Sequence, residues 1–285
     1  MKTVEEQLAV IKSLIGDDCD IKVKEDGFLS RGFVIDNGRL VFKFPRNKDV
    51  RYKTEIENLN YINSLNLGIN LQKVAFTSAN DEYLGIYGVL GSSLEEVGLN
   101  NKQLNAVGTQ LGNFLKRLHA ITGHNGQPCV LKDEVESWQK RVVAVDDFLV
   151  KTFSKKEQSL IKKLMFDYMP NRLKELGEKL VFSHGDLGDG NILVDGHSKV
   201  GVIDFNDSGL LDEAADFMDI KSNRICEVML DTYGADDVLR EKVALRRDIR
   251  PLIVLKPYLT RNDPKVIGEI VAKIRNTLAK YESIM

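Results

Sequence analysis

Three oxygen-bearing side chains fall at fixed intervals in one short stretch of the chain. Asp186 and Asn191 are five residues apart, and Asp204 follows Asn191 after thirteen more. Two β-rich runs joined by the turn residues Asp195-Gly196 lie between Asn191 and Asp204, so a hairpin would bring these two side by side. Carboxylate and carboxamide oxygens are ligands for Mg²⁺, with phosphate oxygens and water completing its octahedron. The spacing predicts a magnesium site at Asn191 and Asp204 and leaves Asp186 to accept a proton from an attacking hydroxyl.

The stretch that carries these residues resembles the catalytic loop and metal motif of antibiotic kinases. It contains FSHGDLGDGNI at residues 182–192 and IDFNDSGLLDEAAD at residues 203–216. His-Gly-Asp-x-x-x-x-Asn followed by Ile-Asp-Phe resembles the antibiotic-kinase version of the protein-kinase loop, and the whole block is most similar to the aminoglycoside 3′-phosphotransferases. A hairpin whose turns happen to use Asp, Asn and Gly is the alternative. The ordered set across residues 184–216 argues against it.

The resemblance implies a role for each matching residue. Asp186 would be the catalytic base, and Asn191 and Asp204 would hold Mg²⁺ beside ATP or GTP. Asp212 and Asp216 match acids that follow the metal aspartate in this family and would brace the loop. The implied fold is α+β and protein-kinase-like, with a small antiparallel β-sheet in the N-terminal lobe and a mostly helical C-terminal lobe.

A lysine and a glutamate near the N-terminus fit the nucleotide side of the same pattern. Lys43 lies on a predicted strand at 40–44, between two phenylalanines that would point to the opposite face of the sheet. Glu55 lies on the next predicted helix, at about 50–65, in a phrase that resembles Glu-x-Glu-x-Leu of the family. In kinases such a lysine reaches the α- and β-phosphates, and the helix glutamate holds it. We expect a Lys43–Glu55 pair, with Glu57 as the alternative partner; a lysine on a solvated strand face is the competing interpretation.

The loop expected to cover the phosphates departs from the kinase glycine pattern. Residues 27–32 contain two glycines but no GxGxxG motif. Ser30 could offer its hydroxyl and N–H to a β-phosphate, and an ordinary hairpin loop explains the same residues equally well. Residues 83–90 resemble the hinge between kinase lobes, where backbone groups read the base. The choice between ATP and GTP stays open.

Turn residues and alternating apolar residues predict a small sheet in the first part of the chain. Asp26-Gly27 and Asn37-Gly38 mark two tight turns. A helix is expected at 3–15, and strands are expected at 21–23, 32–35, 40–44, 72–77 and 83–90.

After residue 90 the apolar spacing changes to that of helices. Helices are expected at 101–121, 134–152, 155–178, about 212–232 and 264–282, with a β-rich interruption at 179–206. A chain of 285 residues also exceeds the usual size of a single core. We therefore expect two lobes: residues 1–90, which bind the nucleotide, and residues 91–285, which carry the catalytic loop, metal site and acceptor site.

Composition argues against several other classes of protein. The net charge is −2 and no basic stripe is present, so we expect no nucleic-acid partner. No apolar run of about 18 residues exists, so we expect no membrane span. Acids near the N-terminus replace the apolar run of a signal peptide, and three widely spaced cysteines fit a reducing compartment. A cytoplasmic location is expected.

Acidic residues gather after the catalytic loop, where ten acids stand between residues 204 and 237 against two bases. A cationic acceptor needs carboxylates that lack partner cations, and Asp207, Glu213 and Asp231 are the candidates. The acids within residues 133–136 offer a second acidic rim. An acidic helix face that is only solvated is the alternative.

Two departures limit what the resemblance implies. The 3′-phosphotransferases typically carry arginine where this chain has Asp207, and their chains end sooner after the catalytic loop. The position of the modified hydroxyl is therefore not carried over.

Three functions fit these residues. The first is an ATP- or GTP-dependent phosphotransferase that modifies a hydroxyl of an aminoglycoside antibiotic and so confers resistance. The second is a kinase of the same fold that acts on choline, an amino alcohol or a sugar, although residues 204–240 show no aromatic cluster for a quaternary ammonium. The third is a nucleotide-binding regulator without turnover, against which the complete catalytic set argues. A protein kinase is the least expected, because the loop has HGD in place of HRD.

Overall fold

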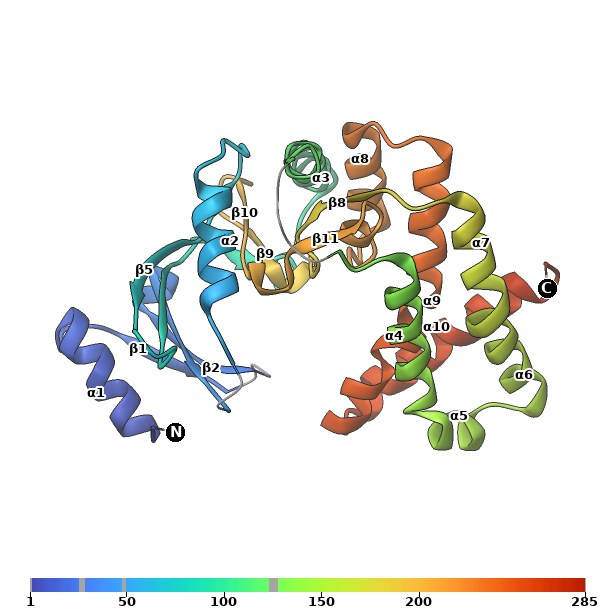
Figure 1. Cartoon of the computed structure of the whole chain (residues 1–285), viewed down its shortest axis with the longest axis horizontal. Coiled ribbons are helices and arrows are strands. Elements are labelled where there is room, and N and C mark those ends of the chain that lie inside the picture. Colours follow the sequence, from blue (N-terminus) through green and yellow to red (C-terminus); the bar gives the residue numbers. More distant parts are fainter. Residues whose placement is uncertain (1, 26–28, 48–49, 123–127, 285) are drawn as a thin grey trace.

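A small sheet-based lobe and a larger helical lobe lie side by side (Figure 1). The structure is a computed structural model that describes residues 2–25, 29–47, 50–122 and 128–284. The fold is α+β, as the sequence predicts. Within these described ranges, the structure contains no helix with the length and apolar character needed to cross a membrane.

The elements of the sheet-based lobe come first in the chain, and most of the helices follow. The α-helices of the described ranges are α1 (Val4–Ile15), α2 (Lys53–Asn63), α3 (Asn101–Leu118), α4 (Leu131–Val143), α5 (Asp146–Thr152), α6 (Lys155–Lys163), α7 (Met169–Leu176), α8 (Asn223–Tyr233), α9 (Asp237–Arg261) and α10 (Pro264–Glu282). The strands are β1 (Ile21–Lys24), β2 (Ser30–Ile35), β3 (Leu40–Pro45), β4 (Asn70–Leu71), β5 (Lys73–Thr77), β6 (Leu84–Tyr87), β7 (Ser92–Ser93), β8 (Leu180–Ser183), β9 (Ile192–Val194), β10 (Val200–Val202) and β11 (Gly209–Asp212). Short helical turns are η1 (Asp36–Gly38), η2 (Leu164–Tyr168), η3 (Asp189–Asn191), η4 (Phe205–Asp207) and η5 (Ala215–Phe217).

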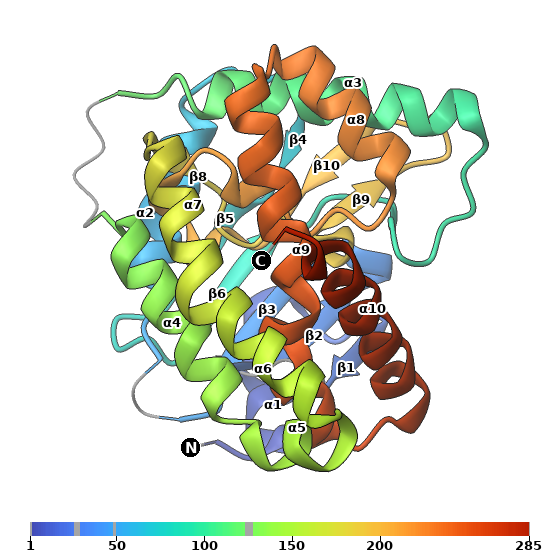
Figure 2. The ribbon, with the colours of Figure 1, turned by 90° about the vertical axis from the view of Figure 1, so that its right-hand side faces the viewer.

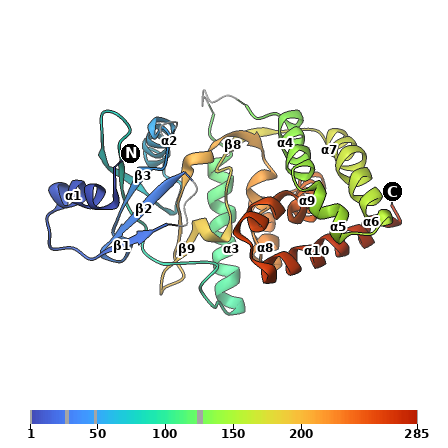
Figure 3. The same cartoon turned by 90° about the horizontal axis from the view of Figure 1, so that it is seen from below.

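The N-terminal sheet is antiparallel, with the strand order β1-β2-β3-β6-β5. Phe33, Phe42 and Phe44 are buried in one apolar cluster with Ile11 of α1, and Figure 3 shows α1 on the outer side of the sheet. Lys43 alternates with these phenylalanines and therefore points to the other face, toward Asp204 after β10. The predicted alternation thus turns the lysine toward the second lobe.

The turn between β2 and β3 forms where Asn37-Gly38 predicts it. The two strands pair directly on either side, and Asn37 and Gly38 have positive φ values of 55° and 94°. Glycine adopts this left-handed backbone at little cost, and Asn tolerates it. The other predicted turn, Asp26-Gly27, lies outside the described residues.

Two short sheets carry the segment that is predicted to be catalytic. β9 and β10 form the predicted hairpin, in which Ile192 pairs with Val202 and the Ile203 N–H donates to the Asn191 carbonyl oxygen (3.0 Å). This sheet has the order β4-β10-β9-β7, and β8 pairs separately with β11. Asn191 and Asp204 therefore flank the open end of one hairpin.

Three apolar clusters stabilise the molecule. The first joins α1 to the outer face of the N-terminal sheet. The second lies where the lobes meet, among α2, β6, α3, β9, β10 and α8, and the third lies among α4–α7, α9 and α10. α9 contributes Leu239 and Val243 to the second cluster and Ile249 and Leu252 to the third. Figure 2 shows α9 between α7 and α10, so one helix ties the helical lobe to the catalytic core.

Two predicted helices differ from the structure. The helix predicted at 212–232 is wrong over its first part, because residues 209–212 pair with β8 as β11 and α8 begins only after Ser222. The helix predicted at 134–152 is divided into α4 and α5. In both places tertiary pairing or a local break overrides the apolar spacing on which the prediction depends.

The longest helix of the described ranges, α9, has no counterpart among the predicted elements. Pro251 and Pro257 lie inside it, and a proline removes a helical hydrogen bond and disfavours helix at the residue before it. Leu239, Val243 and Ile249 are buried along the helix. Packing against two apolar clusters therefore outweighs the cost of the two prolines.

Candidate active site

One buried carboxylate supports the loop between β8 and β9. Asp216 accepts hydrogen bonds from the backbone N–H groups of His184 and Gly185, both at 2.9 Å. Gly185 has a φ of 85°, and a Cβ at this position would lie 2.2 Å from the carbonyl oxygen of Asp207. Glycine is required here both for the left-handed backbone and for the close approach. These two features fix the loop that presents Asp186.

Asp186 is half-buried and is oriented by Asn191. The side-chain amide of Asn191 donates to Oδ2 of Asp186 (3.0 Å) and to its carbonyl oxygen (2.9 Å). Burial raises the pKa of the Asp186 carboxyl, and the negative charges of Asp219, Asp207 and Asp204 raise it further. A carboxylate with a raised pKa is a better proton acceptor. The geometry thus suits Asp186 to general-base chemistry.

Lys43 crosses from the N-terminal sheet to the catalytic hairpin. Its Nζ lies 2.6 Å from Oε1 of Glu55 and 3.0 Å from Oδ1 of Asp204. Burial alone would lower the pKa of Lys43, but the attraction of both carboxylates outweighs burial and raises it. Glu57 is 63% exposed and lies 3.9 Å from Lys53. The pair is therefore Lys43–Glu55, and the alternative partner Glu57 faces solvent.

Asn191 and Asp204 together offer oxygen atoms that fit a magnesium ion. The amide nitrogen of Asn191 is hydrogen-bonded to Asp186, which leaves its Oδ1 for a cation. Asp204 uses Oδ1 for Lys43 and has a second carboxylate oxygen. Among the described residues no group of three or more His, Cys, Asp or Glu side chains is placed to hold a metal. An ion at this site would therefore need phosphate oxygens from a nucleotide to complete its coordination.

Ser30 lies on β2, on the face of the sheet that carries Lys43, because it pairs with Pro45 and Gly32 pairs with Lys43. Its Oγ is 2.9 Å from the hydroxyl oxygen of Tyr52. Tyr52 was not among the predicted site residues, and no motif marks it. Gly27 and Phe28 of the predicted phosphate loop lie outside the described residues.

Comparison with known proteins decides the family. Residues 20–246 match the family model described as the phosphotransferase enzyme family. The chain belongs to this phosphotransferase family. It is an enzyme, a small-molecule kinase, as the catalytic loop predicts.

Solved structures of similar fold cover almost the whole phosphotransferase. The GDP complex of aminoglycoside 2'-phosphotransferase-IIIa superimposes with a TM-score of 0.74 at 17% identity, covering 98% of this chain and 99% of that chain. The complex of gentamicin with APH(2'')-IIa gives 0.71 at 18% identity, covering 96% of each chain. The macrolide 2'-phosphotransferase MphH from Brachybacterium faecium gives 0.65 at 18% identity, covering 94% and 97%. The two-lobe, protein-kinase-like fold is therefore shown.

A second set of charges in the phosphotransferase is buried beneath the catalytic loop. Asp212 lies 2.8 Å from Lys242 and 3.2 Å from Arg246, and Arg246 lies 2.8 Å from Glu134. Burial would raise the pKa of Asp212, but Arg246 and Lys242 outweigh burial and lower it. The sequence did not reveal these two cations, because both belong to α9.

Two of the three carboxylates predicted to bind the acceptor already have cationic partners. Glu213 is buried and lies 2.7 Å from Lys179 and 3.5 Å from Lys242. Asp231 lies on α8, 2.6 Å from Arg240. The prediction that Glu213 and Asp231 lack partner cations is wrong, because Lys179 before β8 pairs with Glu213 and α9 brings Lys242 and Arg240 to these acids.

Two other carboxylates shape the environment of the catalytic loop. Asp207 is exposed and acts on the pKa of Asp186 through its charge. Asp219 acts more strongly on the same group and forms an ion pair with Arg250 of α9. Asp219 was not singled out in the sequence, where it is one acid among many.

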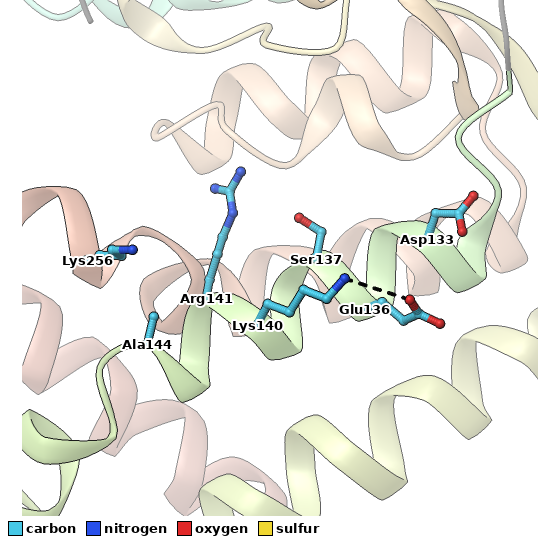
Figure 4. A pocket seen from close by; sticks show the side chains of 7 residues that line it. All are labelled: Asp133, Glu136, Ser137, Lys140, Arg141, Ala144 and Lys256. Carbon is cyan, nitrogen blue, oxygen red and sulfur yellow. Dashed lines mark ion pairs between the residues drawn. The ribbon is translucent and has the colours of Figure 1, made fainter.

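A groove of about 380 Å³ lies along the exposed face of α4 (Figure 4). Its lining side chains are charged or small and come from α4, the residue that follows it, and α9: Asp133, Glu136, Ser137, Lys140, Arg141, Ala144 and Lys256. Glu136 lies 4.0 Å from Lys140, while Arg141 and Lys256 form no ion pair with any described residue. Glu134 turns inward to α9. Three basic side chains face two acids in this groove, so it is not the acidic rim that residues 133–136 predict.

Proposed function

We propose that this phosphotransferase moves the γ-phosphoryl group of ATP or GTP to a hydroxyl of a small cationic molecule of the aminoglycoside type. One observation carries the proposal. Lys43 of the N-terminal sheet reaches Asp204 of the catalytic hairpin at 3.0 Å, while Asn191, at the start of the same hairpin, donates a hydrogen bond to Asp186 of the preceding loop (3.0 Å). The groups that phosphoryl transfer requires therefore converge from both lobes.

The residues divide the reaction among them. The oxygen of the acceptor hydroxyl forms a bond to the γ-phosphorus, and Asp186 accepts the proton of that hydroxyl. The bond between that phosphorus and the bridging oxygen breaks, and ADP or GDP leaves. Lys43, held by Glu55, binds the α- and β-phosphates, and Asn191 and Asp204 would hold Mg²⁺. When bound, the ion supplies positive charge that neutralises the phosphate oxygens.

Two observations support a cationic acceptor. The similar structures include complexes with gentamicin, kanamycin and streptomycin. Asp207 is also exposed near the catalytic carboxyl and forms no ion pair with another described residue. An excess of negative charge at the attacking hydroxyl favours an ammonium-bearing acceptor.

The groove on α4 favours a second candidate, a kinase for a neutral or weakly charged acceptor such as a sugar, an amino alcohol or a macrolide. Arg141 and Lys256 line this groove without ion-pair partners among the described residues. Three basic side chains against two acids give this groove a small positive excess, which disfavours a polycation along α4. One of the similar structures is a macrolide 2'-phosphotransferase.

An acceptor screen tests the proposal. The purified chain is incubated with Mg²⁺ and either ATP or GTP, together with aminoglycosides, a macrolide, choline, amino alcohols or sugars. We expect ADP or GDP release that depends on an aminoglycoside, with a phosphorylated product seen by mass spectrometry. Release that depends only on a neutral acceptor would support the second candidate, and no acceptor-dependent release in any arm would refute both.

A further inference from the structure

Tyr52 occupies an unusual position for a polar side chain. It directly precedes α2 as its N-cap residue, and it is only 2% exposed. Its backbone N–H donates to Oδ1 of Asp81 (3.1 Å), and its hydroxyl oxygen lies 2.9 Å from Oγ of Ser30. Tyr52 therefore connects β2, α2 and the turn between β5 and β6 through hydrogen bonds at both of its ends.

Both elements that Tyr52 joins carry residues of the nucleotide side. Glu55 follows three residues later, in the first turn of α2, and holds Lys43 at 2.6 Å. Ser30 lies on the same face of the sheet as Lys43. A shift of Tyr52 would therefore move the helix that orients the lysine and release the serine hydroxyl at the same time.

Either hydroxyl can donate in the hydrogen bond between Tyr52 and Ser30. Burial raises the pKa of Tyr52 to about 12, so the phenol keeps its proton and can donate it. A serine hydroxyl has one proton and two lone pairs. If Tyr52 donates to Oγ of Ser30, the serine proton stays free for a phosphate oxygen.

We propose that Tyr52 is a positioning residue for the nucleotide: it holds Ser30 as a hydrogen-bond donor to a phosphate and fixes the start of α2, on which Glu55 and Lys43 depend. This inference rests on the proposed function, because it presumes that the phosphates lie beside Lys43. Tyr52 is almost fully buried, so it would act through Ser30 and α2.

The test is a double-mutant cycle on nucleotide binding, measured by titration calorimetry with Mg²⁺ and ATP or GTP and without any acceptor. The variants are Tyr52→Phe, Ser30→Ala and the double variant. Tyr52→Phe removes the hydrogen bond to Ser30, and Ser30→Ala removes that bond together with the donor to the phosphate; each should weaken binding about threefold to tenfold. The double variant should bind nucleotide within about twofold of whichever single variant has the lower affinity, because both changes act on the same contact of Ser30.

Two further measurements separate positioning from general stability. Tyr168→Phe serves as the matched control, because Tyr168 lies in the helical lobe against Tyr281, and it should bind nucleotide like the wild type. With an active acceptor, Tyr52→Phe should raise the KM for nucleotide and leave kcat within about twofold. Unchanged binding in Tyr52→Phe, or losses that multiply in the double variant, would overturn the inference and leave the proposed function standing. A wild type that binds neither nucleotide would overturn both.

Discussion

Two clusters of charge in this phosphotransferase have similar members and different surroundings. In the cleft cluster, one cation, Lys43, is shared by Glu55 and Asp204, and the Asp204 side chain is 43% exposed. In the C-lobe cluster, three cations face three acids: Lys179, Lys242 and Arg246 with Asp212, Glu213 and Glu134. The C-lobe cluster is balanced and mostly buried, so we assign it to stability. The cleft cluster has one acid in excess and an open side, which suits it to receive a ligand.

The largest effect that separates catalysis from stability is expected at Asp186. Asp186→Asn keeps an oxygen that can accept from Asn191 but removes the base. We expect acceptor-dependent transfer to fall about 10²–10⁴-fold, while calorimetric nucleotide affinity and the urea midpoint stay near the wild-type values. Glu227→Gln, on the exposed face of α8, is the matched control. Undiminished turnover in Asp186→Asn would remove this residue from the base role.

The C-lobe cluster should respond in the opposite way. Asp212→Asn leaves Lys242 and Arg246 buried without full compensation, and Arg246 is only 1% exposed. Breaking a buried ion pair in this way costs about 3–5 kcal/mol of unfolding free energy, which equilibrium urea unfolding would measure.

The pH dependence of this stability has a definite sign. The pKa of Asp212 is lowered in the folded state. The stability that this carboxylate contributes is therefore present above the unfolded pKa of about 3.9 and is lost as pH falls through the folded value.

If Asp212→Asn unfolds at the wild-type urea midpoint, the C-lobe cluster does not stabilise the fold and the comparison between the two clusters fails.

Glu55 and Glu57 on α2 allow a comparison between a buried acid that pairs with Lys43 and an exposed acid nearby. Glu55→Gln removes a charge-assisted hydrogen bond to Lys43 and should raise the KM for nucleotide about tenfold to a hundredfold. Glu57→Gln, two residues away and exposed, should leave it unchanged. Equal effects in steady-state kinetics would mean that the Lys43–Glu55 pair has no special role.

The smallest predicted effect concerns pH and activity. Because the pKa of Asp186 is raised by burial and then by Asp219, the carboxyl becomes protonated at a higher pH than an ordinary aspartate. Transfer should fall as pH is lowered through this raised value. Asp219→Asn removes one of the negative charges, so the acid limb of kcat/KM should move to lower pH. A limb that stays in place would show that Asp219 does not act on the base.

The sequence could predict the cleft cluster and the catalytic loop because their members are local. Asp186, Asn191 and Asp204 come from one loop and one hairpin, and the strand alternation alone orients Lys43. Partners of Glu213 and Asp231 could not be found in this way. Lys179 reaches Glu213 only because β8 pairs with β11, and Lys242 and Arg240 come from α9, a helix whose prolines obscure its apolar spacing. Only the tertiary structure therefore reveals these pairs.

The boundary between the two lobes is a prediction that the structure does not test. The division into residues 1–90 and 91–285 stays a prediction, and the apolar cluster where the lobes meet takes residues from both sides of that boundary. Tyr52 could not have been singled out, because its role depends on a hydrogen bond to a strand 22 residues earlier.

The tight fit at Gly185 restricts how this loop can change over evolutionary time. Any side chain there meets the carbonyl oxygen of Asp207 and a backbone that disfavours L-residues. HRD loops have arginine at the place of Gly185. Replacing Gly185 by arginine would require the segment at Asp207 to move away at the same time. The two segments must therefore evolve together, and single substitutions at Gly185 should be removed by selection.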